Sequence, residues 1–295
     1  MRPAGGRARA ISEVRSPGGR ADDVAMTLLN GSGRVALVTG GARGIGRALC
    51  ERLGHDGFRV AVNYRSDAAA ARSLVERLRS AGVRAVALQA DVCDPEQAGD
   101  LVHAAAEHFG AGVSILVNNV GEFSLSPVAA TSVQRWDDVI TSNLHSTFYV
   151  TRAALPGMRE QRYGRVVTIG LSASLIVRGA PNIAAYSVAK TGVAVLTRSL
   201  AVEEAPHGIT VNCVAPGLID NGHLLPRQQE WMARRVPAGR LGTGEDIAEA
   251  VAFLVSDRAA YVSGATLAVA GAWDWEDRRT DHDEGVLEVY EDKAA

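Results

Sequence analysis

The stretch Arg34-Val35-Ala36-Leu37-Val38-Thr39-Gly40-Gly41-Ala42-Arg43-Gly44-Ile45-Gly46 decides the fold of this 295-residue chain. Its first part, Arg34 to Thr39, is a short apolar run rich in β-branched residues, which predicts a buried strand. A glycine-rich turn follows, and then a helix is expected to about Asp56, with Gly57 placed to end it in a left-handed conformation. Together these segments predict a phosphate cradle, because glycines let the backbone approach and free amides at a helix N-terminus favour an anion.

Strand-like and helix-like segments alternate along the rest of the chain. Strands are expected at residues 59–63, 83–88, 113–117, 165–169, 209–214 and 266–270. Helices are expected at 68–81, 95–108, 133–161, from Tyr186 to about 205, and at 243–255. The alternation predicts the α/β class, as a single Rossmann-type doubly wound domain with about seven parallel strands and helices on both faces. Residues 220–239 show only a loose apolar pattern, so neither a helix nor a strand is predicted there.

Composition narrows the range of partners. A formal net charge of -2 gives no electrostatic reason to expect nucleic acid or an anionic membrane surface. No apolar run approaches the roughly 20 residues that a bilayer-spanning helix needs.

Three scattered cysteines, Cys50, Cys93 and Cys213, are typical of buried thiols in a reducing compartment, which predicts a cytoplasmic location. A cluster around His103 and His108 lies on a polar helical face, so no metal site is predicted.

The two ends of the chain differ in character from its middle. Residues 1–30 are rich in arginine, glycine and alanine without apolar periodicity, which predicts a disordered leader; Met26 is an alternative start. Residues 31–272 form the predicted folded domain. Residues 273–295 are acidic and patternless, which predicts a flexible tail.

The end of the second strand, Tyr64-Arg65-Ser66-Asp67, bears on cofactor choice. In a dinucleotide-binding fold an acidic residue at this point would hydrogen-bond the ribose 2′-hydroxyl. Here Arg65 and Arg43 offer two guanidinium groups to one site, which favours a 2′-phosphate and hence NADP(H). NAD(H) stays an alternative because Asp67 is close by.

The pair Tyr186 and Lys190 stands at the start of a predicted helix, four residues apart. This spacing places both side chains on one face of the helix, one turn apart. An ammonium group near a phenol favours the phenolate, so we expect the pKa of Tyr186 to be lowered toward neutral pH. The pair is therefore suited to proton transfer in alcohol–ketone chemistry.

With these motifs in order, the sequence resembles the classical short-chain dehydrogenase/reductase family over about residues 31–272, and most of all its 3-oxoacyl-carrier-protein reductases. The stretch Thr39 to Gly46 is similar to the family's cofactor turn. Asn118-Asn119-Val120-Gly121 is similar to its Asn-Asn-Ala-Gly motif, and Pro216-Gly217 to the turn beside the nicotinamide. Asn143 matches the asparagine of the family's proton relay, and Asp91 its adenine-pocket aspartate.

The resemblance implies a site with defined roles. Tyr186 would exchange a proton with the substrate oxygen, Lys190 would hold the nicotinamide ribose and lower the tyrosine pKa, Asn143 would fix a relay water, and a serine would polarise the carbonyl. The implied cofactor-binding residues are Gly40, Arg43, Gly44, Ile45, Gly46, Tyr64, Arg65, Ser66, Asp91, Val92, Asn118, Val120, Gly121, Tyr186, Lys190, Pro216, Gly217 and Ile219.

Three positions depart from the family pattern. The family serine stands thirteen residues before the tyrosine, which lands on Ala173, so the hydroxyl is expected from Ser172 in preference to Ser174, with neither as a further alternative. Val120 replaces the usual alanine, and Asn221 stands where a threonine often contacts the carboxamide.

The leading hypothesis is an NADP(H)-dependent oxidoreductase that reduces a ketone or 3-oxoacyl group to a secondary alcohol. The alternatives are an NAD-dependent secondary-alcohol dehydrogenase and a non-catalytic dinucleotide-binding homologue. The substrate would be a small carbonyl or alcohol compound, or an acyl group on a carrier protein. The resemblance also implies a homotetramer built from the faces of the Asn143 and Tyr186 helices.

Overall fold

The computed structural model describes residues 33–172, 181–220, 222 and 224–273. The predicted leader falls before this part and the predicted tail after it, apart from Trp273. Ser174 and Asn221 also lie outside the described residues.

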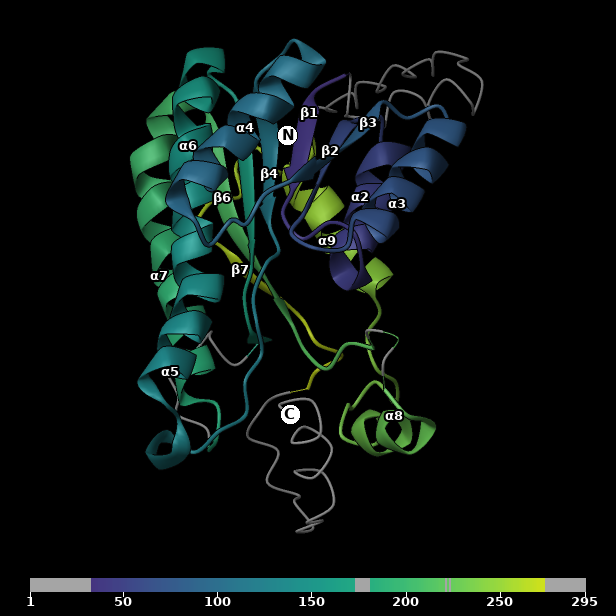
Figure 1. The fold of residues 1–295 in the computed structure, drawn as a ribbon, viewed down its shortest axis with the longest axis vertical. Helices are drawn as coiled ribbons and strands as arrows, with labels where there is room; N and C mark the ends of the chain where they lie inside the picture. The colour runs from purple at the N-terminus through teal and green to yellow at the C-terminus, as the bar shows by residue number, and fades with distance from the viewer. Residues whose placement is uncertain (1–32, 173–180, 221, 223, 274–295) are drawn as a thin grey trace, which may run out of the picture.

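One parallel sheet organises the described chain (Figure 1). It has seven strands in the order β3-β2-β1-β4-β5-β6-β7, so the prediction of a seven-stranded Rossmann-type sheet is confirmed. The strands are β1 (Val35–Val38), β2 (Arg59–Tyr64), β3 (Ala85–Gln89), β4 (Val113–Asn118), β5 (Gly164–Ile169), β6 (Ile209–Pro216) and β7 (Thr266–Val269). Strands β1, β4 and β5 are buried along their whole length. Such continuous apolar runs are typical of parallel strands covered on both faces.

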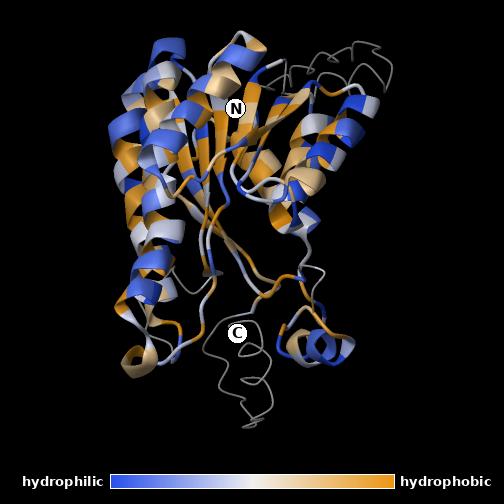
Figure 2. Cartoon of the chain, in the orientation of Figure 1, coloured by the Kyte–Doolittle hydropathy of each residue, from blue (hydrophilic) through white to orange (hydrophobic). Residues whose placement is uncertain are grey.

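Helices cover both faces of the sheet. One layer contains α2 (Gly44–His55), α3 (Ala68–Ser80) and α9 (Gly244–Val255), whose apolar side chains join one core cluster. The opposite layer contains α4 (Pro95–Phe109), α6 (Ser146–Gln161) and α7 (Ala184–Glu204), which pack into a second cluster. Figure 2 shows the apolar strands between these helices, whose outer surfaces are largely hydrophilic.

The carboxyl ends of the strands share one edge of the sheet, and beside that edge lie α5 (Val133–Ile140) and α8 (Pro226–Ala233), on opposite sides (Figure 1). Strand order reverses between β1 and β4, because β2 and β3 follow β1 on one side while β4 lies on the other. In open parallel sheets, ligands bind at the carboxyl ends of the strands near this reversal point. The topology therefore places the functional site beside Thr39 and Asn118.

Two features differ from the elements expected from sequence. The stretch expected as one helix over 133–161 is divided by a π-helical turn, Thr141–His145, between α5 and α6. Helix α8 falls in residues 220–239, where no element was predicted. None of its residues is buried, so it lacks the apolar periodicity that identifies a helix in sequence.

Candidate active site

The glycine turn between β1 and α2 is held open by the neighbouring strand. The Gly41 amide donates to the Asn63 backbone carbonyl (2.8 Å), and the Gly40 amide donates to Asn63 Oδ1 (3.1 Å). Helix α2 then begins at Gly44, after Arg43, without a hydrogen bond from a capping side chain. The first amides of α2 are thus free to bind an anion, as the predicted phosphate cradle requires.

Two glycines of the turn need to be glycines for different reasons. A Cβ at Gly46 would overlap the Gly40 carbonyl oxygen and lie 2.8 Å from Asn119 Nδ2. Gly44 has a φ of +52°, and a Cβ built there meets no atom within 4 Å. Gly46 thus allows α2 to approach β1 closely, whereas Gly44 combines a left-handed conformation with the open space that a ligand needs.

Thr39 joins this turn to the end of β4. Its hydroxyl accepts hydrogen bonds from the amides of Asn119 (2.9 Å) and Val120 (3.2 Å), and Asn119 Nδ2 donates to the Thr39 carbonyl (3.0 Å). The side chain of Val120 lies against Gly40. Sequence reasoning included Thr39 in the cofactor turn, but it identified neither the hydrogen bonds of Thr39 to the end of β4 nor those of Asn63 to the turn, because these join separate strands.

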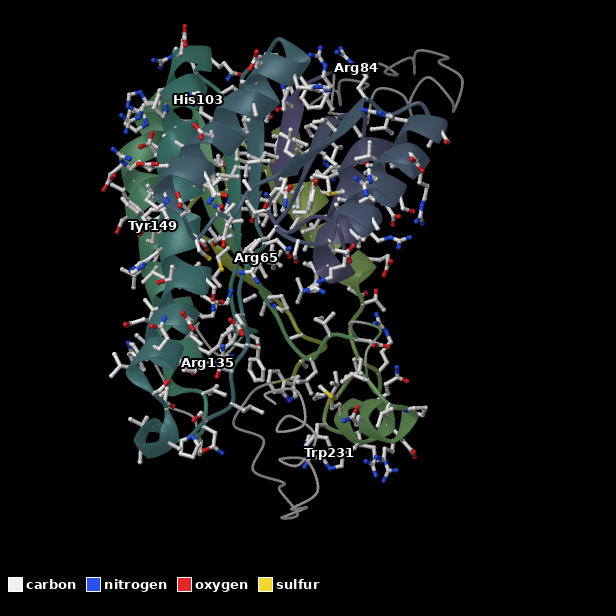
Figure 3. The ribbon with its side chains drawn as sticks, viewed as in Figure 1. Arg65, Arg84, His103, Arg135, Tyr149 and Trp231 are labelled. Atoms are coloured by element: carbon white, nitrogen blue, oxygen red, sulfur yellow. The ribbon has the colours of Figure 1, made fainter. Side chains whose placement is uncertain are left out.

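The end of β2 presents Arg65 toward the same edge of the sheet. Arg65 is 71% exposed, and its Nη1 lies 3.8 Å from Asp91 Oδ2 (Figure 3). Asp91 Oδ1 also accepts from the Cys93 amide at 3.0 Å. Asp67, which kept NAD(H) open as an alternative, instead caps α3 by accepting from the Ala70 amide at 2.9 Å. Arg43 is exposed in the glycine turn, and Tyr64, at the end of β2, is half-buried.

Tyr186 and Lys190 lie on one face of α7, as their spacing predicted. Lys190 Nζ is 5.6 Å from the Tyr186 ring centroid and donates to the Ile169 carbonyl at the end of β5 (2.7 Å). Lys190 is 3% exposed. Burial lowers the pKa of Lys190 to about 8, although the neighbouring Cys213 acts in the opposite direction.

The expectation that Lys190 lowers the pKa of Tyr186 is wrong for the protein alone. Burial raises the pKa of the Tyr186 phenol to about 12. Burial disfavours the charged phenolate, and Lys190 Nζ donates its hydrogen bond to the Ile169 carbonyl. At neutral pH Tyr186 is therefore a protonated phenol, able to donate a proton.

Asn143 reaches the site from the π-helical turn. Its Nδ2 donates to the carbonyls of Val139 and Glu122, both at 2.9 Å, while its buried Oδ1 has no hydrogen-bond partner among the described residues. Asn143 Oδ1 and Lys190 Nζ both face the same point beside Gly121. A π-helical turn within an α-helix is frequently found at functional sites, and here it leaves one acceptor unsatisfied at the predicted relay position.

Ser172 follows the buried Leu171 in the chain, three residues after the end of β5. It is 7% exposed, and its Oγ has no hydrogen-bond partner in the described part of the chain. A buried hydroxyl without a partner carries a cost, which a substrate carbonyl or a water could relieve. The choice of Ser172 as the catalytic hydroxyl stays a prediction.

The loop after β6 lies at the same edge of the sheet. Gly217, after Pro216, donates its amide to the Val269 carbonyl at 3.1 Å, and a Cβ there would lie 2.8 Å from Ala270. Ile219 bridges to Gly242 ahead of α9. These contacts hold the loop that follows β6 at the carboxyl edge of the sheet.

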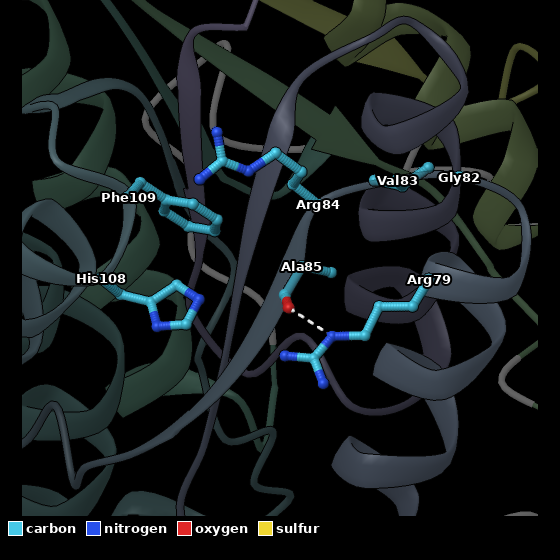
Figure 4. A pocket seen from close by; sticks show the side chains of 7 residues that line it. All are labelled: Arg79, Gly82, Val83, Arg84, Ala85, His108 and Phe109. Carbon is cyan, nitrogen blue, oxygen red and sulfur yellow. Dashed lines mark hydrogen bonds between the residues drawn. The ribbon is translucent and has the colours of Figure 1, made fainter.

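A hollow of about 310 Å³ lies at the opposite end of the molecule, between Arg79 and Arg84 on one side and His108 and Phe109 on the other (Figure 4). Arg79 Nε donates to the Ala85 carbonyl at 3.0 Å, and the Arg84 guanidinium lies 5.9 Å from the Phe109 ring centroid. This hollow is at the amino end of β3, and none of the candidate catalytic residues lines it.

Within the described ranges, no group of three or more His, Cys, Asp or Glu side chains is arranged to hold a metal ion. None of the helices in that part of the chain is both long and apolar enough to cross a membrane.

Comparison with known proteins identifies the family of the chain. The model of a family described as enoyl-(acyl carrier protein) reductase matches residues 40–272. The chain belongs to the short-chain dehydrogenase/reductase family and is an oxidoreductase of the kind that uses NAD(P)(H).

Named relatives differ in substrate. The 3-oxoacyl-[acyl-carrier-protein] reductase FabG of Staphylococcus aureus (strain Mu50 / ATCC 700699) is 40% identical over 239 residues, covering 80% of this chain and 96% of the relative. The 3beta-hydroxysteroid dehydrogenase 1 of Eggerthella lenta is 39% identical over 244 residues, covering 81% and 93%. The crystal structure of a dehydrogenase/reductase from Sinorhizobium meliloti 1021 superposes with a TM-score of 0.77 at 36% identity, covering 84% and 98%.

The residues at the site fit a dinucleotide. The uncapped start of α2 and the open space at Gly44 suit a pyrophosphate. Among the described residues, the buried Asn143 Oδ1 and Ser172 Oγ have no hydrogen-bond partner, so both can bind a water or a ligand.

Proposed function

We propose that the chain is an NADP(H)-dependent reductase that converts a ketone or 3-oxoacyl group to a secondary alcohol. The observation that carries the proposal is the convergence of Tyr186, Lys190 and Asn143 at the carboxyl edge of the sheet, next to an open glycine turn. These groups can supply and replace one proton at a point that a dinucleotide bound in the turn would reach.

Each residue has a distinct role in this proposal. Tyr186 donates its phenolic proton to the substrate oxygen, and because burial raises its pKa, this donation depends on stabilisation of the phenolate by a neighbouring positive charge. Lys190, held by the Ile169 carbonyl, carries the positive charge that stabilises the phenolate left behind. Asn143 Oδ1 binds the water that returns a proton, and Ser172 Oγ donates to the carbonyl oxygen. The bound NADPH supplies the hydride.

Cofactor choice rests on the end of β2. Arg65 is 71% exposed, and its Nη1 lies 3.8 Å from Asp91 Oδ2, so its guanidinium is available for a 2′-phosphate. Asp67 caps α3 instead of facing a ribose hydroxyl. Both observations favour NADP(H) over NAD(H).

The substrate class and assembly extend the proposal. The names of two relatives include a 3-oxoacyl-[acyl-carrier-protein] and a 3beta-hydroxysteroid, and either kind of compound suits the chemistry proposed here. A homotetramer is supported by Val188, Val195 and Val202, which lie seven residues apart on α7 and are 51%, 57% and 78% exposed. Apolar side chains in such a row are typical of an interface with another copy. A cytoplasmic location stays a prediction.

Fluorescence titration with NADPH and NADH tests the proposal. The wild-type protein should bind NADPH at least tenfold more tightly than NADH, and Arg65→Ala should remove most of that difference, about 1.4 kcal/mol or more. Arg72→Ala is the matched control, because Arg72 is an exposed arginine on α3 outside the site. Equal or tighter NADH binding would favour the NAD-dependent dehydrogenase. Binding of neither would favour a non-catalytic role.

A further inference from the structure

The loop after β4, residues 122–124, is fixed by one arginine. Arg135, on α5, donates to Glu122 Oε1 at 2.7 Å, to Ser124 Oγ at 3.1 Å and to the Phe123 carbonyl at 3.5 Å. Figure 3 shows Arg135 on the α5 side, below the carboxyl edge of the sheet. One guanidinium thus contacts three successive residues and sets the backbone path between them.

The same loop is tied to the relay residue from its other side. Asn143 Nδ2 donates to the Glu122 carbonyl at 2.9 Å. The loop is therefore held between Arg135 on α5 and Asn143 on the π-helical turn, so its position is fixed relative to the candidate catalytic groups.

Phe123 is the side chain that this loop presents to the site. Its ring centroid lies 5.1 Å from that of Tyr186, with the ring planes at 82°, an edge-to-face arrangement. Phe123 remains 39% exposed despite this contact. A large apolar side chain that contacts the proposed proton donor and still has exposed surface is placed to contact whatever the donor acts on.

We propose that Phe123 is a specificity-determining residue, forming an apolar aromatic wall that favours carbonyl substrates carrying a ring next to the reacting carbon over linear ones. Arg135 is a positioning residue that holds this wall in place. This inference rests on the proposed reduction at Tyr186. Its physical basis is that a flat ring next to the carbonyl can stack on Phe123, whereas a short alkyl group covers less of that surface.

The selectivity between two methyl ketones tests the inference. Acetophenone and 2-butanone share the reacting group and differ in a phenyl against an ethyl substituent. Phe123→Ala should lower the ratio of kcat/KM for acetophenone to that for 2-butanone by about tenfold, through KM for acetophenone, and leave NADPH affinity within twofold. Arg135→Gln should lower the same ratio by a smaller factor. Phe253→Ala is the matched control, because Phe253 is 44% exposed on α9 in the opposite helix layer, and its ratio should not change.

A binding measurement separates this inference from the proposed reaction. Calorimetry measures 1-phenylethanol and 2-butanol binding to the protein–NADPH complex, in which no hydride transfer to the alcohol can occur. Preference for 1-phenylethanol that is lost in Phe123→Ala supports the aromatic wall even if the wild type reduces neither ketone. A selectivity that Phe123→Ala leaves within twofold, in both kinetics and binding, overturns it.

Discussion

Replacing Gly121 with alanine adds one methyl group at the point where Lys190 and Asn143 meet. A Cβ at Gly121 would overlap Asn143 Oδ1 and lie 3.0 Å from Lys190 Nζ and 3.2 Å from Asn143 Cγ. To restore an ordinary van der Waals separation, Asn143 Oδ1 would have to move by roughly 1 Å. Asn143 is fully buried and its Nδ2 is held by two carbonyls at 2.9 Å, so it cannot swing away freely.

This displacement of Asn143 Oδ1 would disturb the proposed proton relay. A misplacement of about 1 Å at a catalytic constellation can lower the rate by about 10²-fold. Gly121→Ala should therefore reduce kcat for carbonyl reduction by about 10²-fold, measured as NADPH oxidation at saturating substrate. The overlap with buried Asn143 should also lower the thermal midpoint, since overpacking costs about 1–3 kcal/mol, so kcat is measured well below that midpoint.

The matched control is Gly99→Ala, which adds the same methyl group on α4 where a Cβ meets no atom within 4 Å. It should keep full activity and stabilise the helix by up to about 1 kcal/mol. Wild-type kcat in Gly121→Ala, with the folded fraction verified by circular dichroism, would refute the placement of Lys190 and Asn143 in one relay.

Three further predictions concern pH and stability. Because the pKa of Lys190 is lowered to about 8, its charge is lost as the pH rises, so kcat/KM for reduction should fall about tenfold per unit well above pH 8; a profile flat to pH 10 would contradict this. Thr243→Ala removes the α9 cap at the Asp246 amide (3.3 Å) and should cost about 1 kcal/mol in urea unfolding, with Thr243→Ser close to wild type. Thr151→Val leaves the buried Asn118 Nδ2 without its 2.9 Å partner and should cost about 1–3 kcal/mol; an unchanged urea midpoint would show that this bond contributes nothing.

The fold could be predicted from the sequence because its signals are local. Each strand is a short, mostly apolar run bounded by turn residues, and the strands lie where the apolar runs placed them, within about two residues at each end. Helix α8 escaped prediction because it buries none of its residues. The π-helical turn escaped because it changes the hydrogen-bond pattern without changing the apolar periodicity.

The site could be predicted only in part. Tyr186 and Lys190 share a helix face, so their spacing alone brings them together. The pKa of Tyr186 was predicted in the wrong direction, because the sequence shows a neighbouring charge but not the burial that outweighs it. The contacts of Asn63 to the glycine turn and of Arg135 to the Phe123 loop join distant elements, so no short pattern identifies them.

The most direct test of the central claim is the rate of hydride transfer from NADPH to a reducible ketone in Tyr186→Phe, measured in a single turnover. Loss of the phenolic proton should lower this rate by about 10²–10⁴-fold. The NADPH dissociation constant should stay within a few-fold of wild type, because the glycine turn and Arg65 are untouched. Transfer at the wild-type rate in Tyr186→Phe would contradict the assignment of Tyr186 as the proton donor.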